Sequence, residues 1–118
     1  MESGSHTAVL GLGYVGCVTA ACLAELGHQV MGVDRDEHKV HNVLAGRPPF
    51  YEPGLDSMVQ RNVDASRLSA STSLADAMQE ADIAFICVFT PSAKTGDLGL
   101  DQLRRVIVVI ASTLPWRI

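Results

Sequence analysis

The feature that most constrains this chain is a glycine-rich hexapeptide, GLGYVG at residues 11–16, between a short apolar run and a segment rich in alanine and leucine. The spacing G-x-G-x-x-G suits a tight passage from a strand into a helix. In such a passage Gly11 permits the turn, Gly13 leaves room for a ligand beside the backbone, and Gly16 lets helix and strand pack closely. The hexapeptide therefore predicts the first half of a βαβ unit.

The rest of the sequence continues this alternation of strands and helices. The predicted strands are residues 7–10, 29–33, 68–71, 83–88 and 107–111, and the predicted helices are residues 15–26, 37–45, a short helix opening at 52–55, 73–80 and a stub at 101–105. Apolar strands separated by helices indicate a parallel sheet covered on both faces, so we expect residues 83–88 to be a buried strand. The sequence thus predicts an α/β fold, a Rossmann-like doubly wound parallel sheet of about five strands in a single domain.

Several polar side chains are expected to begin helices. Asp36 is suited to cap the helix at 37–45, and Ser73 with Asp76 resembles a capping box. For Glu52 we expect only an introductory role, since a carboxylate near a helix N-terminus is stabilised by up to about 1 kcal/mol. Pro53 is expected at or near the first turn of the same helix, where its missing N–H costs nothing.

Length and charge narrow the range of functions. The chain has 118 residues, a formal charge of -4 and a pI near 5.4, which disfavours a nucleic-acid surface because that surface needs clustered Lys and Arg. The longest apolar run, residues 83–89, is far shorter than the roughly 20 residues of a membrane-spanning helix. Residues 1–6 are a polar tail without the basic and apolar regions of a signal peptide. We expect a cytoplasmic protein whose partners include neither nucleic acid nor membrane.

The hexapeptide and the residue that ends the next strand together indicate a dinucleotide site. Backbone N–H groups in the first turn of the helix would point at the phosphates, with the helix dipole behind them. Asp34, at the end of the strand at 29–33, can accept hydrogen bonds from the adenosine ribose and would repel a 2′-phosphate, which favours NAD over NADP. Arg35 is the residue that could soften this preference. The alternative is a glycine turn that holds no ligand.

The cysteines and histidines suggest neither a nucleophile nor a metal site. Cys17, Cys22 and Cys87 have no C-x-x-C spacing, and we expect them to be reduced thiols in the core. Cys17 near a helix N-terminus could be a reactive thiol instead, but a ligand is the better occupant of that helix end. His38 and His41 lack a suitable third ligand nearby in the sequence and are expected on a solvated helix face. We therefore assign no catalytic and no metal-binding residue.

Further motifs resemble a single family. They are GLGYVG at 11–16, GVDRDEHKV at 32–40, YEPGL at 51–55, FICVFTPS at 85–92, GDLGL at 96–100 and STLP at 112–115. Together they resemble the N-terminal NAD-binding domain of the UDP-glucose/GDP-mannose 6-dehydrogenase family, over residues 7–115. EPGL combined with the V-x-T-P-S loop is the most specific part, since generic dinucleotide folds do not share it. Residues 116–118 depart from the family, which has glycine and threonine after the proline.

The resemblance implies a set of cofactor contacts. Tyr14 and Val15 would contact the cofactor at the phosphate loop, and Asp34 and Lys39 would hold its adenosine end. Thr90 and Thr113 would face the nicotinamide, at the carboxyl ends of their strands. Taken from the residues alone, Lys39 also fits a solvated helix position and Thr90 a helix or turn cap. With the glycines, the implied cofactor-binding residues are Gly11, Gly13, Tyr14, Val15, Gly16, Asp34, Lys39, Thr90 and Thr113.

The resemblance also implies a reaction and a partner. The family oxidises the C6 alcohol of UDP-glucose or GDP-mannose to a uronate for polysaccharide biosynthesis, with NAD as hydride acceptor and a downstream cysteine that holds the aldehyde stage. Its members are homo-oligomers. No cysteine of this chain falls in the family's cysteine motif, so we expect a truncated NAD-binding domain that is inactive alone. The alternative is a stand-alone NAD-binding or regulatory module without catalysis.

Overall fold

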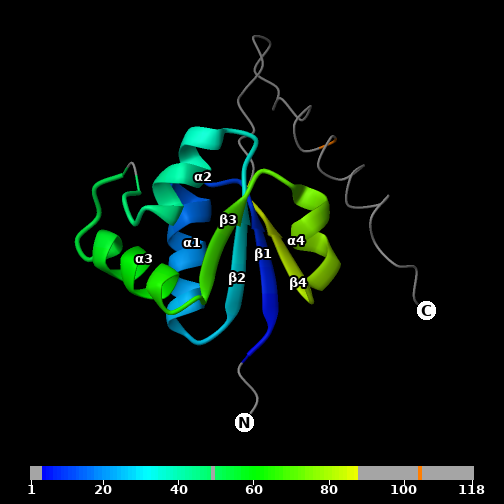
Figure 1. The fold of residues 1–118 in the computed structure, drawn as a ribbon, viewed down its shortest axis with the longest axis horizontal. Helices are drawn as coiled ribbons and strands as arrows, with labels where there is room; N and C mark the ends of the chain where they lie inside the picture. The colour runs from blue at the N-terminus through cyan, green and yellow to red at the C-terminus, as the bar shows by residue number, and fades with distance from the viewer. Residues whose placement is uncertain (1–3, 49, 88–103, 105–118) are drawn as a thin grey trace, which may run out of the picture.

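The structure, a computed structural model, describes residues 4–48, 50–87 and 104. Strands and helices alternate along most of the described chain (Figure 1). In chain order the elements are β1 (His6–Leu10), α1 (Tyr14–Glu25), β2 (Gln29–Val33), α2 (Glu37–Leu44), α3 (Leu55–Asp64), β3 (Leu68–Ser71), α4 (Leu74–Glu80) and β4 (Ile83–Ile86). The predicted strand at 107–111 and, apart from Arg104, the predicted helix at 101–105 lie outside the described residues.

The strands form one parallel sheet in the order β3-β2-β1-β4. Leu10 of β1 is in register with Val33 of β2 on one side and with Ile86 of β4 on the other. The chain therefore adds β2 and then β3 on one side of β1, and afterwards crosses over so that β4 pairs with the other side of β1. This confirms the predicted α/β, Rossmann-like doubly wound fold. In such sheets ligands bind where the strand order reverses, outside the carboxyl ends of the strands.

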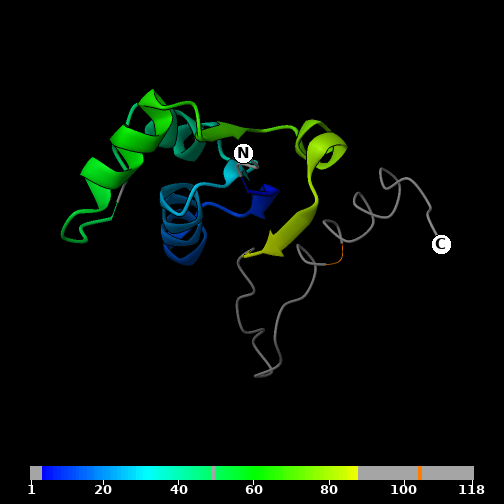
Figure 2. The same ribbon diagram turned by 90° about the horizontal axis from the view of Figure 1, so that it is seen from below.

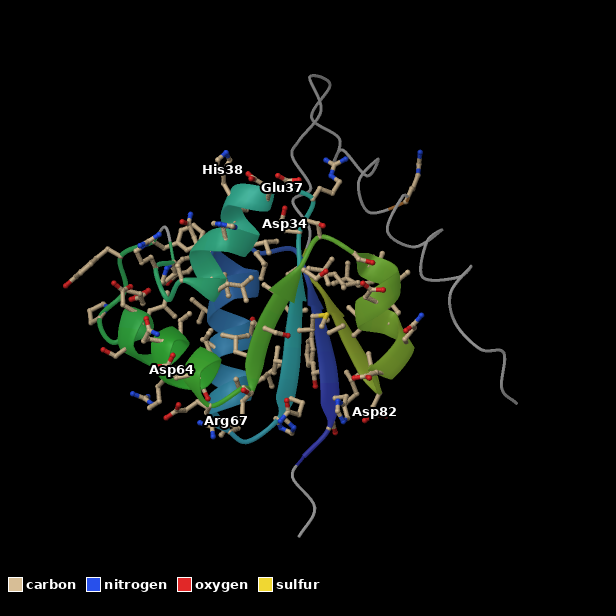
Figure 3. All side chains as sticks on the ribbon, in the orientation of Figure 1. Asp34, Glu37, His38, Asp64, Arg67 and Asp82 are labelled. Carbon is tan, nitrogen blue, oxygen red and sulfur yellow. The ribbon has the colours of Figure 1, made fainter. Side chains whose placement is uncertain are left out.

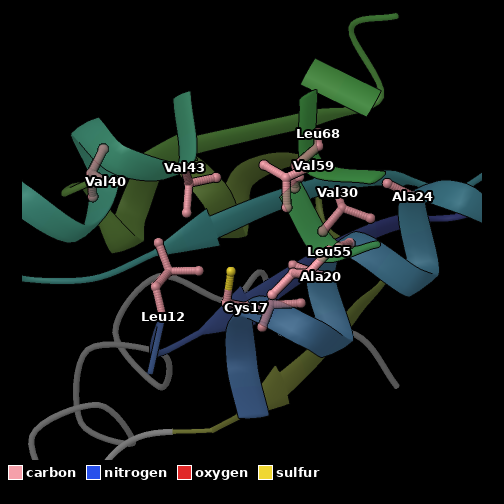
Figure 4. Close-up of a cluster of buried hydrophobic side chains, with 12 residues drawn as sticks. Leu12, Cys17, Ala20, Ala24, Val30, Val40, Val43, Leu55, Val59 and Leu68 are labelled. Carbon is pink, nitrogen blue, oxygen red and sulfur yellow. The ribbon is translucent and has the colours of Figure 1, made fainter. Parts of the chain in front are cut away.

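Within the described residues, more helices pack on one face of the sheet than on the other. Helices α1, α2 and α3 lie on one face and α4 on the other, as the two ribbon views show (Figures 1 and 2). Side chains of β1 alternate accordingly: Val9 packs with Cys17 and Ala20 of α1, whereas Ala8 and Leu10 pack with residues of α4. The larger cluster, which also includes Leu12, Val30, Val43, Val59 and Leu68, is shown in Figure 4.

Most helix ends follow the predicted signals, but α3 does not. Asp36 accepts a hydrogen bond from the backbone N of His38 at 2.9 Å, and Ser73 accepts one from the backbone N of Asp76 at 3.2 Å. Helix α3 begins at Leu55, and its N-cap is Gly54 in the left-handed region at φ 84°. A helix therefore does open within the predicted residues 52–55, but Glu52 and Pro53 lie before it and not in its first turn, because Gly54 takes the N-cap in a conformation that only glycine adopts without strain.

The expectation that residues 83–88 form a buried strand is also wrong over its described part, residues 83–87, and residue 88 lies outside the described residues. Strand β4 ends at Ile86, and Ile83, Phe85 and Ile86 are 49%, 40% and 43% exposed. Among the described elements β4 pairs only with β1. The core beneath α4 is made by residues of β1, β2 and α4, to which β4 contributes the half-buried Ala84. An apolar run in the sequence therefore does not establish that both faces of a strand are covered.

The described part of the chain contains neither a membrane-spanning helix nor a metal-binding cluster. Within residues 4–48 and 50–87, no helix combines the length and the apolar character needed to cross a bilayer. In the same ranges no three His, Cys, Asp or Glu side chains are grouped as metal ligands would be.

Candidate functional site

The candidate site lies at the carboxyl end of the sheet, where the chain passes from β1 into α1. Backbone hydrogen bonds fix this passage from both sides: Gly11 N donates to Val33 O, and Cys87 N donates to Leu10 O, each at 2.7 Å. Figure 3 shows Asp34 at this end of the sheet, on the side opposite Arg67 and Asp82. The β1–α1 loop is therefore set between the ends of β2 and β4, at the reversal of strand order.

The geometry explains, for each glycine of the hexapeptide separately, why glycine occupies that position. Gly11 has φ 105°, which agrees with the predicted tight turn because other residues rarely adopt it. A Cβ on Gly16 would overlap with the carbonyl oxygen of Gly11, so only glycine allows α1 to pack so close to the loop. A Cβ on Gly13 would meet no atom of residues 4–48 or 50–87 within 4 Å. The glycine at residue 13 therefore leaves open space beside the backbone, which packing within the protein does not require.

The N-terminus of α1 faces this open space with backbone N–H donors that have no hydrogen-bond partner among the described residues. Gly13 is the N-cap, and the first intrahelical bond is donated by Cys17 N to Gly13 O at 2.9 Å. The backbone N–H groups of residues 13–16 thus have no carbonyl within the helix to bond. The first turn of α1 contains no acidic residue that would offset the positive end of the helix dipole. These features suit the binding of an anion such as a phosphate group.

The side chain of Asp34 lies beside the β1–α1 loop and is hydrogen-bonded to it. Its Oδ2 accepts a hydrogen bond from Leu12 N at 2.8 Å, and its Oδ1 accepts one from Asp36 N at 2.9 Å. The Nζ of Lys39 lies 4.0 Å from Oδ2, and the Asp34 side chain is only 12% exposed. A carboxylate oxygen has two lone pairs, so each oxygen can still accept a hydroxyl hydrogen bond. Sequence spacing placed Asp34 at the end of β2, but it gave no sign of the bond to Leu12.

Tyr14, the first residue of α1, contacts the segment that precedes α3. Its hydroxyl donates a hydrogen bond to Oε1 of Glu52, and its ring meets Phe50 edge to face at 5.6 Å between centroids. The hydrogen bond to Glu52, together with desolvation and the charge of Glu52, raises the pKa of Tyr14. Sequence reasoning missed this role of Glu52. The only signal was that YEPGL and GLGYVG occur in the same chain.

The structure brings most of the predicted cofactor-binding residues to one place. Residues 11–16 form the loop and the start of α1, with Val15 64% exposed. Asp34 lies beside them at the start of the β2–α2 connection, and Lys39 approaches Asp34 from the first turn of α2. The predicted residues Thr90 and Thr113 lie outside the described residues.

The cysteines differ in environment. Cys17 is buried, and burial raises its pKa to about 11, so burial outweighs the proximity of the helix N-terminus. Cys87 is half-buried, and burial raises its pKa too. Cys22 is exposed, which corrects the expectation that all three cysteines pack in the core. The reason is that Cys22 lies on the solvent-facing side of α1, whereas Ala21 and Ala24 of the same helix are buried.

Comparison with known proteins gives a consistent result. The sequence matches the model of the UDP-glucose/GDP-mannose dehydrogenase family, NAD binding domain, over residues 5–116. It is 44% identical over 98 residues to a GDP-mannose 6-dehydrogenase of Pseudomonas putida, which covers 83% of this chain and 22% of that protein. It is 42% identical over 119 residues to a UDP-glucose 6-dehydrogenase of Pseudomonas aeruginosa, covering 91% of this chain and 26% of the relative.

Solved structures agree with the sequence comparison. A GDP-mannose dehydrogenase from Pseudomonas aeruginosa superposes with a TM-score of 0.87 at 42% identity, over 89% of this chain and 24% of that chain. A UDP-glucose dehydrogenase from Pyrobaculum islandicum gives 0.86 at 39% identity, over 91% and 25%. The present chain thus spans about a quarter of the length of the relatives it matches.

Proposed function

The chain belongs to the UDP-glucose/GDP-mannose dehydrogenase family, as its NAD binding domain, and on this premise we propose that residues 7–115 bind NAD for a nucleotide-sugar 6-dehydrogenase. The family is one of NAD-dependent oxidoreductases, and NAD is the cofactor it indicates. When bound, NAD supplies the acceptor for a hydride from the sugar alcohol. The residues of this chain contribute the binding and the orientation of that acceptor.

One observation carries the proposal: within the described part of the chain, the space beside Gly13 is open and the backbone N–H groups at the start of α1 that face it have no partner. A ligand that approaches there receives hydrogen bonds from residues 13–16 and meets no side chain at Gly13. A pyrophosphate has the charge and the acceptors that this cradle fits. The start of α1 is therefore the place proposed for the centre of the dinucleotide.

Asp34 would determine which dinucleotide is accepted. Its carboxylate is held in place by Leu12 N and Asp36 N, with acceptor capacity left for ribose hydroxyls. A 2′-phosphate at the same ribose would meet a fixed negative charge, with Lys39 at 4.0 Å as a partial counterion. We assign the adenosine end of the cofactor to Asp34 and Lys39, and the nicotinamide end to Thr90 and Thr113.

The proposed substrate is a nucleotide sugar, UDP-glucose or GDP-mannose, since relatives of both kinds resemble the chain about equally. We propose that these 118 residues bind NAD without turnover. Cys17 is buried with its pKa raised to about 11, which disfavours a thiolate that could attack a sugar aldehyde. A role in polysaccharide biosynthesis, a cytoplasmic location and homo-oligomer formation stay predictions.

Isothermal titration calorimetry with NAD and with NADP tests the cofactor assignment. We expect NAD to bind more tightly than NADP, because Asp34 accepts ribose hydroxyls and repels a 2′-phosphate. Asp34→Ala should weaken NAD binding about tenfold or more, as it removes charged hydrogen bonds at the ribose and at Leu12. Asp34→Asn keeps an acceptor for Leu12 N but removes the charge, so it should mainly reduce the preference for NAD.

The matched control is Asp56→Asn, an exposed carboxylate in the first turn of α3, which should leave both affinities unchanged. Circular dichroism verifies that the Asp34 variants stay folded. Equal binding of NAD and NADP by the unaltered chain, or no loss in Asp34→Ala, would contradict the role assigned to Asp34.

A coupled assay of NADH formation tests the absence of turnover. With UDP-glucose or GDP-mannose in excess we expect no NADH from the 118-residue chain, although the same sample binds NAD in the titration. A full-length relative serves as the positive control. NADH formation that depends on either sugar would show that this chain carries the catalytic step.

A stand-alone binding module would also bind NAD without turnover. The DNA that follows codon 118 distinguishes the two cases. A glycine-rich cysteine motif encoded there in any frame supports a piece of a dehydrogenase, and its absence supports the stand-alone module.

A further inference from the structure

The hydrogen bond between Tyr14 and Glu52 joins the candidate cofactor site to a segment 38 residues away in the sequence. Tyr14 immediately follows the N-cap Gly13, so its side chain leaves α1 from the turn whose N–H groups have no partner within the helix. A tyrosine side chain that is not held at this position can rotate about χ1 and χ2, and its ring can then lie over those N–H groups. What holds the Tyr14 side chain therefore affects access to the first turn of α1.

Both partners of Tyr14 are anchored in the core through their own segment. The carbonyl oxygen of Glu52 accepts a hydrogen bond from Leu55 N at 3.0 Å, and Leu55 is 3% exposed within the cluster that includes Cys17 of α1. Phe50 packs against the same cluster and meets the Tyr14 ring edge to face. The backbone of Glu52 and the ring of Phe50 are thus held by contacts that do not involve Tyr14.

We propose that Glu52 is a positioning residue for the cofactor site, which holds Tyr14 against residues 50–52 and keeps the first turn of α1 open to the pyrophosphate. The inference rests on the proposed NAD-binding function and extends it to a residue that touches neither phosphate nor ribose in that assignment. If Tyr14 is already held before the cofactor binds, less side-chain conformational entropy is lost on binding. Glu52 itself acts through Tyr14 and has no contact with the reacting atoms.

The tyrosine content of the chain allows a test of the contact that needs no cofactor. Tyr14 and Tyr51 are its two tyrosines, and Tyr51 is 91% exposed. A pH titration followed by tyrosinate absorbance should therefore contain a step that is displaced to higher pH and belongs to Tyr14. The variant Y14F identifies the displaced step by removing it. In E52Q the displaced step should move to lower pH, because the negative acceptor that opposes ionisation of Tyr14 is gone.

The positioning role is tested by NAD titration of the same proteins. We expect E52Q to weaken NAD binding about fivefold, as one lost preorganising hydrogen bond implies, while the ratio of NAD to NADP affinity is unchanged. Because Glu52 acts through Tyr14, the double variant Y14F/E52Q should bind NAD no more weakly than Y14F alone. Asp56→Asn, in the first turn of α3 and close to Glu52 in the sequence, is the charge-matched control and should change neither readout.

The outcomes separate this inference from the proposed function. An unchanged tyrosinate titration in E52Q overturns the contact, and unchanged or tighter NAD binding in E52Q overturns the positioning role. Additive losses in the double variant also overturn it, since they would mean that Glu52 acts independently of Tyr14. If the unaltered chain binds no NAD, the proposed function fails and the positioning role fails with it, whereas the titration step still reports the contact.

Discussion

Gly16→Ala should destabilise the domain by about 3 kcal/mol or more, the upper end of what an extra methyl group in a tightly packed site causes. The new Cβ would overlap with the carbonyl oxygen of Gly11 and press on its carbonyl carbon. Neither atom belongs to a flexible side chain, and Gly11 is fixed by its N–H bond to Val33 O at 2.7 Å. Relief therefore requires α1 to move away from the sheet. Chemical denaturation followed by circular dichroism measures the loss.

Gly13→Ala is the matched control for this substitution, because it adds the same methyl group to the same loop. Gly13 has φ -71°, which alanine adopts freely, and its Cβ would meet no atom of the described residues within 4 Å. We expect stability to fall by no more than about 1 kcal/mol, the difference between glycine and alanine at an N-cap. NAD affinity should fall sharply, since the methyl group occupies the space proposed for the pyrophosphate. Equal loss of stability in both variants would contradict the separate tasks assigned to the two glycines.

Asn62→Leu should cost about 2 to 4 kcal/mol of stability, because it removes three hydrogen bonds of a buried amide at roughly 1 kcal/mol each. Asn62 is fully buried. Its amide nitrogen donates to Glu25 Oε1 at 2.9 Å and to Met58 O at 2.8 Å, and its oxygen accepts from Arg67 Nε at 2.9 Å. Leucine is similar in size to asparagine but satisfies none of these groups. Thermal and urea unfolding measure the change.

Ser57→Leu, an exposed position on the same helix α3, is the control and should stay within about 0.5 kcal/mol of the unaltered chain. The pH dependence provides a second readout. Hydrogen bonds from Arg61 and from Asn62 lower the pKa of Glu25, so Glu25 contributes stability above its unfolded pKa and loses it as the pH falls through its folded pKa. Asn62→Leu should reduce that acid-side slope. A small loss of stability together with an unchanged slope would show that the Asn62 amide contributes nothing to the contact between α1 and α3, where Arg61 also bonds Glu25.

Local signals in the sequence predicted the elements because each signal is a property of a few neighbouring residues. Strand β2 and strand β3 occur at the predicted residues 29–33 and 68–71, where short apolar or β-prone runs are bounded by polar residues. Asp36 and Ser73 cap helices as predicted, since a cap depends on residues within one turn. The start of α3 was placed too early because Glu52 and Pro53 resemble a first helical turn. In the structure Gly54, at φ 84°, takes the N-cap position after them.

The sequence by itself determined the parallel α/β fold, the turn at residues 11–16 and the position of Asp34 at the end of β2, because sterics and hydrophobic periodicity act over short stretches of chain. Only the tertiary structure decided the contacts that make these residues one site. Asp34 bonds Leu12 across 22 residues, Tyr14 bonds Glu52 across 38, and Asn62 bonds Glu25 across 37. Such pairs depend on how helices pack on a sheet, which no spacing in a single sequence specifies. The same reason explains β4: its apolar residues were visible in the sequence, but whether another element covers them is a property of the assembled layers.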